Sequence, residues 1–210
     1  MKNGICYIVG AGENYGLDFT PLADDYVIAV DGGFSYLQDA DIAADLVIGD
    51  FDSLEQRPEH SNVVTLPREK DETDTLAAIQ YGIEKGYRIF HIYCGMGGRF
   101  DHSIANIQAL SYLSQMGLQG LLFGKDSVLT AITDGKITFP HDAKGYISVF
   151  SMTDKSIGVD IKGLKYELEN AELTNHFPVG VSNEFTGSKS SISVSDGTLL
   201  IVYPIGTKFP

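Results

Sequence analysis

Short apolar runs without strict alternation recur through the first 124 residues of the chain. They occupy residues 5–9, 26–30, 46–48, 63–66, 88–94 and 120–123. A strand that is buried on both faces, as in a parallel sheet, is apolar throughout. Between the runs, Thr73–Lys85 and Ser103–Met116 carry apolar residues at helical spacing, and a glycine follows each stretch. This alternation predicts an α/β domain with a mostly parallel, Rossmann-like sheet flanked by helices.

The pattern changes near residue 124. From Lys125 onward there are only short β-like runs separated by turns, at Ser127–Thr133, Lys136–Phe139, Gly145–Met152, Ser156–Ile161, Ser190–Ser195 and Thr198–Tyr203. Asp134-Gly135 is a hairpin signal between the first two runs. Asp196-Gly197 joins the last two. We therefore expect an α/β domain at residues 1–124, followed by a smaller antiparallel β-sandwich at residues 125–210.

Composition limits the possible partners. The net charge of −13 argues against a duplex nucleic-acid binder, favours a cationic substrate, and requires metal cations if a nucleotide is to bind. The simpler alternative is that the excess acid only keeps the protein soluble. The chain has no apolar run near the roughly 18 residues that span a bilayer, so we expect no membrane partner. Cys6 and Cys94 fall in predicted buried strands, which favours a cytoplasmic location.

Four acidic or glycine-rich segments stand where predicted strands give way to loops or helices. They are Asp31-Gly32-Gly33, Gly49-Asp50-Phe51-Asp52-Ser53, Asp71-Glu72-Thr73-Asp74 and Gly95–His102. Ligands of open α/β sheets bind beyond the carboxyl ends of the strands, so we expect the four segments to converge on one site. Carboxylates, an arginine and bare backbone are suited to a metal-bound polyphosphate.

The acidic segments each allow two interpretations. Asp50 and Asp52 lie two residues apart in an extended segment, so both side chains can share a divalent cation, although an acidic surface turn has the same composition. Asp71 and Asp74 stand at the start of a predicted helix, where Asp or Thr commonly caps the helix. One of the two can cap while the other reaches the metal.

The segment Gly95–His102 is the most specific of the four. It lies between a predicted strand and a helix, so its amides can bind an anion, and Gly97-Gly98 allows close backbone approach. Arg99 offers a planar fork for phosphate, or it pairs with a nearby Asp to hold the loop. The chain contains no P-loop sequence, and Gly10-Ala11-Gly12 is only a fragment of a dinucleotide-binding fingerprint.

These motifs, in this order and spacing, resemble those of the thiamine pyrophosphokinase family. The resemblance extends to Ala105-Asn106, Gly163-Leu164-Lys165-Tyr166-Glu167-Leu168 and Val181-Ser182-Asn183-Glu184. It implies Mg²⁺ at Asp50, Asp52 and Asp74, and catalytic roles for Asp71, Asp74, Arg99 and Asp101. It implies ATP contacts at Asp31, Gly32, Gly33, Gly97, Gly98, Arg99, Asp101, His102 and Asn106, and thiamine contacts at Tyr166, Ser182 and Asn183.

The resemblance also implies a homodimer with sites between subunits, and transfer of the diphosphate of ATP to the hydroxyl of thiamine, giving thiamine diphosphate and AMP. Two alternatives stay open at this point. A pyrophosphokinase for another heterocyclic alcohol, such as a hydroxymethylpterin, would use the same acidic segments. A non-catalytic nucleotide-binding module would bind ATP without forming AMP, although clustered carboxylates near a polyphosphate disfavour it.

Overall fold

The computed structural model describes residues 2–51, 59–67, 69 and 71–208. The chain forms two compact units. One comprises Met1–Ala109 with Gly120–Gly124, and the other comprises Leu110–Gln119 with Lys125–Pro210. Among the described residues, no helix is both long enough and apolar enough to cross a membrane.

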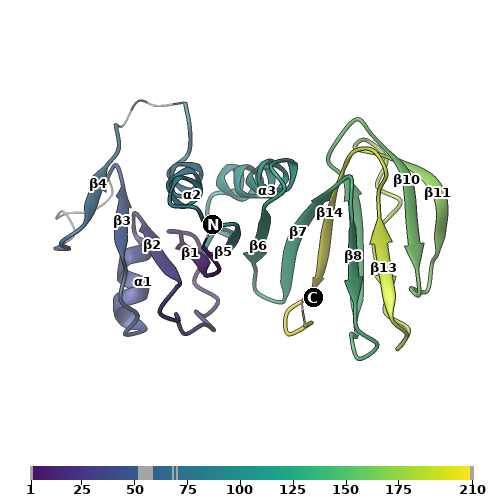
Figure 1. Ribbon diagram of the computed structural model, residues 1–210, viewed down its shortest axis with the longest axis horizontal. Coiled ribbons are helices and arrows are strands. Elements are labelled where there is room, and N and C mark those ends of the chain that lie inside the picture. The colour runs from purple at the N-terminus through teal and green to yellow at the C-terminus, as the bar shows by residue number, and fades with distance from the viewer. Residues whose placement is uncertain (1, 52–58, 68, 70, 209–210) are drawn as a thin grey trace. The chain divides into compact units, whose positions relative to one another are not determined.

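The first unit is built on a sheet of short buried strands (Figure 1). They are β1 (Ile5–Val9), β2 (Tyr26–Val30), β3 (Leu46–Gly49), β4 (Val63–Thr65), β5 (Ile89–Tyr93) and β6 (Gln119–Phe123). Their spatial order is β6-β5-β1-β2-β3-β4, and the pairings from β5 through β1 to β4 are parallel. The predicted fold class is confirmed: the central strands β1, β2 and β3 are buried on both faces as the continuous apolar runs require, and the edge strand β4 is only partly buried.

The order of the strands reverses beside β1. The chain proceeds from β1 outward to β4, then returns to the other side of β1 as β5. Open α/β sheets bind ligands at such a reversal, beyond the carboxyl ends of the strands.

Helices cover both faces of this sheet. Leu37 of α1 (Gly33–Asp39) packs with Tyr7, Val9 and Val27 on one face. On the opposite face, Gly82 of α2 (Asp74–Glu84) lies against Cys6 and Phe90. The third helix, α3 (Phe100–Gln115), begins three residues before the expected start at Ser103. The sequence analysis missed α1 because a helix of seven residues shows too few turns for a periodic pattern.

The second unit contains two groups of antiparallel strands. The first has the order β12-β9-β14-β7, with β7 (Ser127–Thr133), β9 (Tyr146–Ser151), β12 (Asn183–Glu184) and β14 (Thr198–Pro204). The second has the order β11-β10-β13-β8, with β8 (Lys136–Phe139), β10 (Lys155–Lys162), β11 (Leu168–Thr174) and β13 (Ser190–Ser193). Phe139 of β8 packs edge-on against Tyr203 of β14, with ring centroids 5.2 Å apart, so apolar side chains join the two groups.

The expected hairpin at Asp134-Gly135 is wrong. The strands on either side of it, β7 and β8, lie in different sheets, so this turn carries the chain across the sandwich. Asp196-Gly197 makes a second crossing between β13 and β14. The two turns bind each other, since the amide of Asp134 donates to the carbonyl of Gly197 (3.1 Å) and the amide of Gly197 donates to Oδ1 of Asp134 (2.9 Å).

Candidate active site

A cavity of about 600 Å³ opens at the crevice beside β1 in the first unit. Its walls come from the loop after β1, the ends of β2 and β3, the start of α2, the loop after β5 and the first turns of α3. The structure thus brings together residues from all four predicted segments: Asp31, Asp50, Asp74, Gly97, Gly98, Arg99, His102 and Asn106. Asp52 lies outside the described residues.

The loops after β1 and β5 are joined by backbone hydrogen bonds. The amide of Gly12 donates to the carbonyl of Cys94 (2.8 Å), and the amide of Glu13 donates to the carbonyl of Met96 (2.9 Å). A Cβ atom on Gly12 would lie 2.6 Å from the Met96 oxygen and 2.7 Å from the Cys94 oxygen, so only glycine permits this approach. The glycine pair that follows the first strand was the available sequence signal for this part of the site.

The side chain of Glu13 binds the turn at Gly97-Gly98, a role that the sequence analysis did not find. Its Oε1 accepts a hydrogen bond from the amide of Gly98 (3.4 Å), and its Oε2 accepts one from the hydroxyl of Tyr15 (2.8 Å). Gly97 and Gly98 have φ angles of +80° and +61°, the left-handed region that glycine adopts without strain. A side chain on Gly97 would collide with Glu13. Nothing in the sequence distinguishes Glu13 from the other acidic residues of this loop.

Three carboxylates line the cavity: Asp31 follows β2, Asp50 follows β3, and Asp74 begins α2. Asp31 follows β2 in a left-handed conformation (φ +49°), and its Oδ1 is buried with no hydrogen-bond partner among the described residues. Burial, together with the nearby charges of Asp74 and Asp50, raises the pKa of Asp31 to about 6. A side chain on Gly49 would overlap Oδ1 of Asp31, so this glycine makes room for the carboxylate.

This arrangement suits a hard divalent cation. Mg²⁺ takes oxygen ligands, commonly one or two carboxylates together with substrate phosphates. The buried, unpaired Oδ1 of Asp31 and the mutual repulsion of Asp31, Asp50 and Asp74 indicate a position where a cation would relieve unfavourable charge. Within the described ranges no three acidic, His or Cys side chains form a ready-made metal cluster.

The structure shows which residue caps the start of α2 and which of Asp71 and Asp74 reaches the site. Thr73 is the cap, because its Oγ1 accepts a hydrogen bond from the amide of Leu76 (3.2 Å). Asp74, the first helical residue, lines the cavity, whereas Asp71 is exposed and lies outside the described lining. A carboxylate in the first helical turn is also favoured by the helix dipole.

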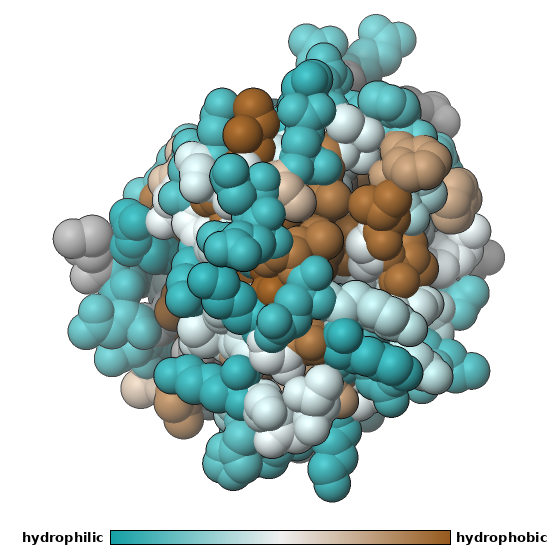
Figure 2. All heavy atoms as spheres, turned by 90° about the vertical axis from the view of Figure 1, so that its right-hand side faces the viewer, coloured by the Kyte–Doolittle hydropathy of each residue, from teal (hydrophilic) through white to brown (hydrophobic). Residues whose placement is uncertain are grey.

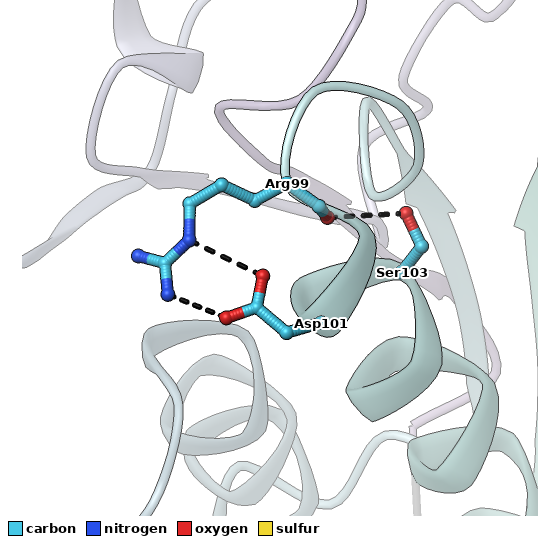
Figure 3. A network of polar contacts seen from close by, with 3 residues as sticks. All are labelled: Arg99, Asp101 and Ser103. Atoms are coloured by element: carbon cyan, nitrogen blue, oxygen red, sulfur yellow. Dashed lines mark hydrogen bonds and ion pairs between the residues drawn. The ribbon is translucent and has the colours of Figure 1, made fainter.

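Arg99 pairs with Asp101 at the start of α3 (Figure 3). Its Nη2 lies 2.6 Å from Oδ2 of Asp101, and its Nε donates to Oδ1 (3.3 Å). Both side chains are exposed. The hydroxyl of Ser103 donates to the carbonyl of Arg99 (3.4 Å), and deeper in the helix Nδ2 of buried Asn106 donates to the carbonyl of Gly95 (2.6 Å). Arg99, His102 and Asn106 line the cavity, while Asp101 holds the guanidinium.

Two residues that were predicted to contact ATP, Gly32 and Gly33, do not line the cavity. Gly33 begins α1 and packs so closely on the carbonyl of Val9 that a Cβ atom would collide with it. Gly32 is the residue just before the helix. Neither is among the described residues that line the cavity, so in this structure both shape the turn that carries Asp31.

The three residues expected to contact thiamine lie near one another in the second unit. Tyr166 is 61% exposed, and Ser182 is exposed in a left-handed conformation (φ +59°) with its amide bonded to Oγ of Ser148 (3.1 Å). Asn183 is buried. Its side-chain amide binds the backbone of Tyr166 at both the N–H and the carbonyl.

The structure is thus an α/β unit with a cavity at the switch point of its sheet, joined to an antiparallel β-unit. Two family profiles match the chain: thiamin pyrophosphokinase, catalytic domain, over residues 22–120, and thiamin pyrophosphokinase, vitamin B1 binding domain, over residues 135–199. The chain therefore belongs to the thiamine pyrophosphokinase family.

Individual relatives agree with this assignment. The chain is 29% identical over 204 residues to thiamine pyrophosphokinase of Bacillus subtilis, covering 93% of this chain and 95% of the relative. The crystal structure of thiamine pyrophosphokinase from Bacillus subtilis superposes with a TM-score of 0.84 at 26% identity, covering 95% of this chain and 98% of that one. The yeast thiamin pyrophosphokinase structure shares the fold, with a TM-score of 0.75 at 16% identity over 97% of this chain and 87% of that chain.

Proposed function

We propose that the cavity of the first unit binds ATP with Mg²⁺, and that the second unit presents thiamine to it. The chain is an enzyme of the thiamine pyrophosphokinase family, whose members transfer pyrophosphate from ATP to thiamine. The observation that carries the assignment of the ATP site is the convergence of Asp31, Asp50 and Asp74 beside the glycine turn at the switch point of the sheet.

Asp50, Asp52 and Asp74 are the proposed metal ligands, and Asp31 lies close to Asp50 and Asp74. When bound, Mg²⁺ supplies the positive charge that lets a protein of net charge −13 accept a polyphosphate. Gly97 and Gly98 line the cavity and let the backbone come close to phosphate oxygens, while the amide of Gly98 already donates to Oε1 of Glu13 (3.4 Å). Arg99 would leave Asp101 or share it, placing its fork on the polyphosphate where negative charge accumulates during transfer.

His102 and Asn106 are proposed to orient the nucleotide. Both line the cavity from the first turns of α3. One N–H of Nδ2 of Asn106 donates to the carbonyl of Gly95, so its contribution to a ligand would come from the second N–H or from Oδ1. Asp71 is exposed and outside the described lining, so its proposed catalytic role is supported by the family resemblance alone.

Thiamine is proposed to bind on the second unit, at Tyr166 and Ser182. The match of residues 135–199 to the vitamin B1 binding profile supports this assignment. Thiamine carries a thiazolium cation, and the exposed ring of Tyr166 can pack on such a cation. The hydroxyl of Ser182 can hydrogen-bond the aminopyrimidine, a kind of contact that discriminates strongly between ligands.

We further propose a homodimer whose sites are built from two subunits. Figure 2, which looks onto the second unit, shows hydrophobic side chains gathered between hydrophilic ones. Ile157, Phe177 and Val179 are exposed on this unit. Apolar patches of this kind commonly mark protein interfaces.

The buried, unpaired thiols of Cys6 and Cys94 fit the reducing conditions of the cytoplasm, where we expect the protein to act.

The test is an assay for AMP formed from ATP. We expect AMP to form with thiamine and Mg²⁺, and not with thiamine alone or with a hydroxymethylpterin in its place. AMP formation with the pterin alcohol would favour the pyrophosphokinase of another heterocycle. Equal ATP binding with and without Mg²⁺, together with no AMP, would favour a non-catalytic nucleotide-binding module.

A further inference from the structure

The connection between β10 and β11 carries the exposed ring of Tyr166 without regular secondary structure. Its residues, 163–167, follow β10 directly and precede β11. An exposed side chain on such a connection is held in place mainly through its backbone, because little packing surrounds the ring. The position of Tyr166 therefore depends on what binds the backbone of this segment.

A single buried side chain binds both polar groups of the Tyr166 backbone. Oδ1 of Asn183 accepts a hydrogen bond from the amide of Tyr166 (2.9 Å), and Nδ2 donates to its carbonyl (2.6 Å). Oδ1 also accepts from the amide of Glu184 (2.9 Å). Asn183 is only 5% exposed, so removing its amide would leave these part-buried backbone groups without their present partners.

Neighbouring bonds fix the same segment to the same strand. Leu164 forms an isolated bridge with Phe185, and the amide of Lys165 donates to the carbonyl of Glu184 (3.0 Å). Nζ of Lys165 binds Oε2 of Glu184 (2.8 Å) and lies 5.8 Å from the centroid of the Tyr166 ring. A cation thus already lies close to this ring, beside a carboxylate.

We propose that Asn183 is a positioning residue for thiamine and acts through Tyr166 rather than by direct contact. This inference rests on the proposed thiamine contact at Tyr166. The sequence suggested that Asn183 itself reads the aminopyrimidine, but in this structure its oxygen accepts twice from backbone amides and one of its N–H groups is used. A ring held at a fixed backbone position costs less ordering entropy when the ligand binds.

A tryptophan reporter tests the anchoring separately from activity. The chain contains no Trp, so Tyr166→Trp creates a protein with a single tryptophan at the site. We expect Asn183→Ala in this background to lower the tryptophan fluorescence anisotropy. Asn183→Asp should do the same, because it keeps the volume but places an oxygen against the Tyr166 carbonyl. Unchanged anisotropy in both variants overturns the proposal.

Kinetics test the action on thiamine. In the protein that keeps Tyr166, Asn183→Ala should raise the thiamine KM by about tenfold, which corresponds to one or two lost hydrogen bonds. The ATP KM should stay within about twofold of its starting value. The matched control is Ile201→Val, which removes a buried methyl group from β14, a strand that pairs with β7 and β9 in the described sheet. Thiamine and ATP KM values that rise together, as a general distortion of both sites would cause, overturn the proposal.

Tyr166→Ala separates a failure of this inference from a failure of the proposed thiamine site. We expect it to raise the thiamine KM at least as much as Asn183→Ala. If Tyr166→Ala leaves the thiamine KM unchanged, the contact at Tyr166 is wrong and the role of Asn183 in thiamine binding is overturned with it. The anisotropy measurement would still report whether Asn183 anchors the segment.

Discussion

Asp74 is the residue on which the proposed ATP site depends most directly. It lines the cavity at the start of α2 and raises the pKa of Asp31. Asp74→Asn should lower kcat by about 10², because a proposed metal ligand loses its charge where the transition state is stabilised. Steady-state kinetics at several Mg²⁺ concentrations measure the effect. Glu72→Gln, in the same segment and outside the described lining, is the control. Full activity of Asp74→Asn at saturating Mg²⁺ would refute the metal assignment.

Arg99 forms an ion pair with Asp101, so the test must separate a role in binding phosphate from a role in holding the loop. Arg99→Lys keeps the charge but loses the two-pronged contact, so we expect kcat/KM to fall by roughly 10- to 100-fold, or about 1.5–3 kcal/mol. The exposed pair with Asp101 contributes little stability, so the melting temperature should hardly change. Unchanged kinetics with a lower melting temperature would show instead that Arg99 only holds the loop.

His91 makes the stability of the first unit depend on pH. Burial between Tyr7 and Phe123 lowers the pKa of His91 to about 4. The unfolded chain takes up the proton near pH 6.5, so the unfolding free energy falls as the pH drops from 6.5 to 4, by up to about 3 kcal/mol. His91→Phe keeps a ring and removes this proton. Denaturant unfolding of both proteins should therefore diverge below pH 6.5, and parallel curves would contradict the assignment.

At the scale of elements, the cap of α2 links stability to the site. Thr73→Ala removes the hydrogen bond to the amide of Leu76 and should lower the unfolding free energy by about 1 kcal/mol. Fraying of the first turn would also move Asp74, so kcat should fall along with stability. Thr73→Ser keeps the hydroxyl and is the matched control. If Thr73→Ala lowers stability but leaves kcat unchanged, the first turn does not position Asp74.

At the scale of the whole molecule, the proposed homodimer predicts complementation between two inactive chains. Asp74→Asn disables the ATP site and Ser182→Ala the proposed thiamine pocket. If each site uses the first unit of one subunit and the second unit of its partner, mixed dimers contain one intact site. AMP formation should then recover in the mixture after subunit exchange. Activity that stays at the level of the separate variants would show that each site lies within one chain.

Sequence reasoning located the elements that local pattern determines. The strands β1 to β6, the helices α2 and α3 and most strands of the second unit follow from apolar runs and helical spacing, which depend only on neighbouring residues. It missed α1, too short for a period, β12, only two residues long, and β11, an edge strand with a single buried side chain. The family resemblance rested on ordered motifs, and the comparisons confirm it.

Contacts between distant segments were decided only by the tertiary structure. Whether Asp134-Gly135 closes a hairpin or crosses the sandwich depends on pairing with Asp196-Gly197, more than 60 residues away. Glu13 reaches the turn at Gly97-Gly98 because the folded backbone brings these groups within hydrogen-bonding distance. The cap of α2 is a local contact, and the structure shows that Thr73 makes it. The amino-acid types along the chain determined which chemistry was available. The order of the strands around β1 determined which of those groups face one cavity, because only folding places the ends of separate strands side by side.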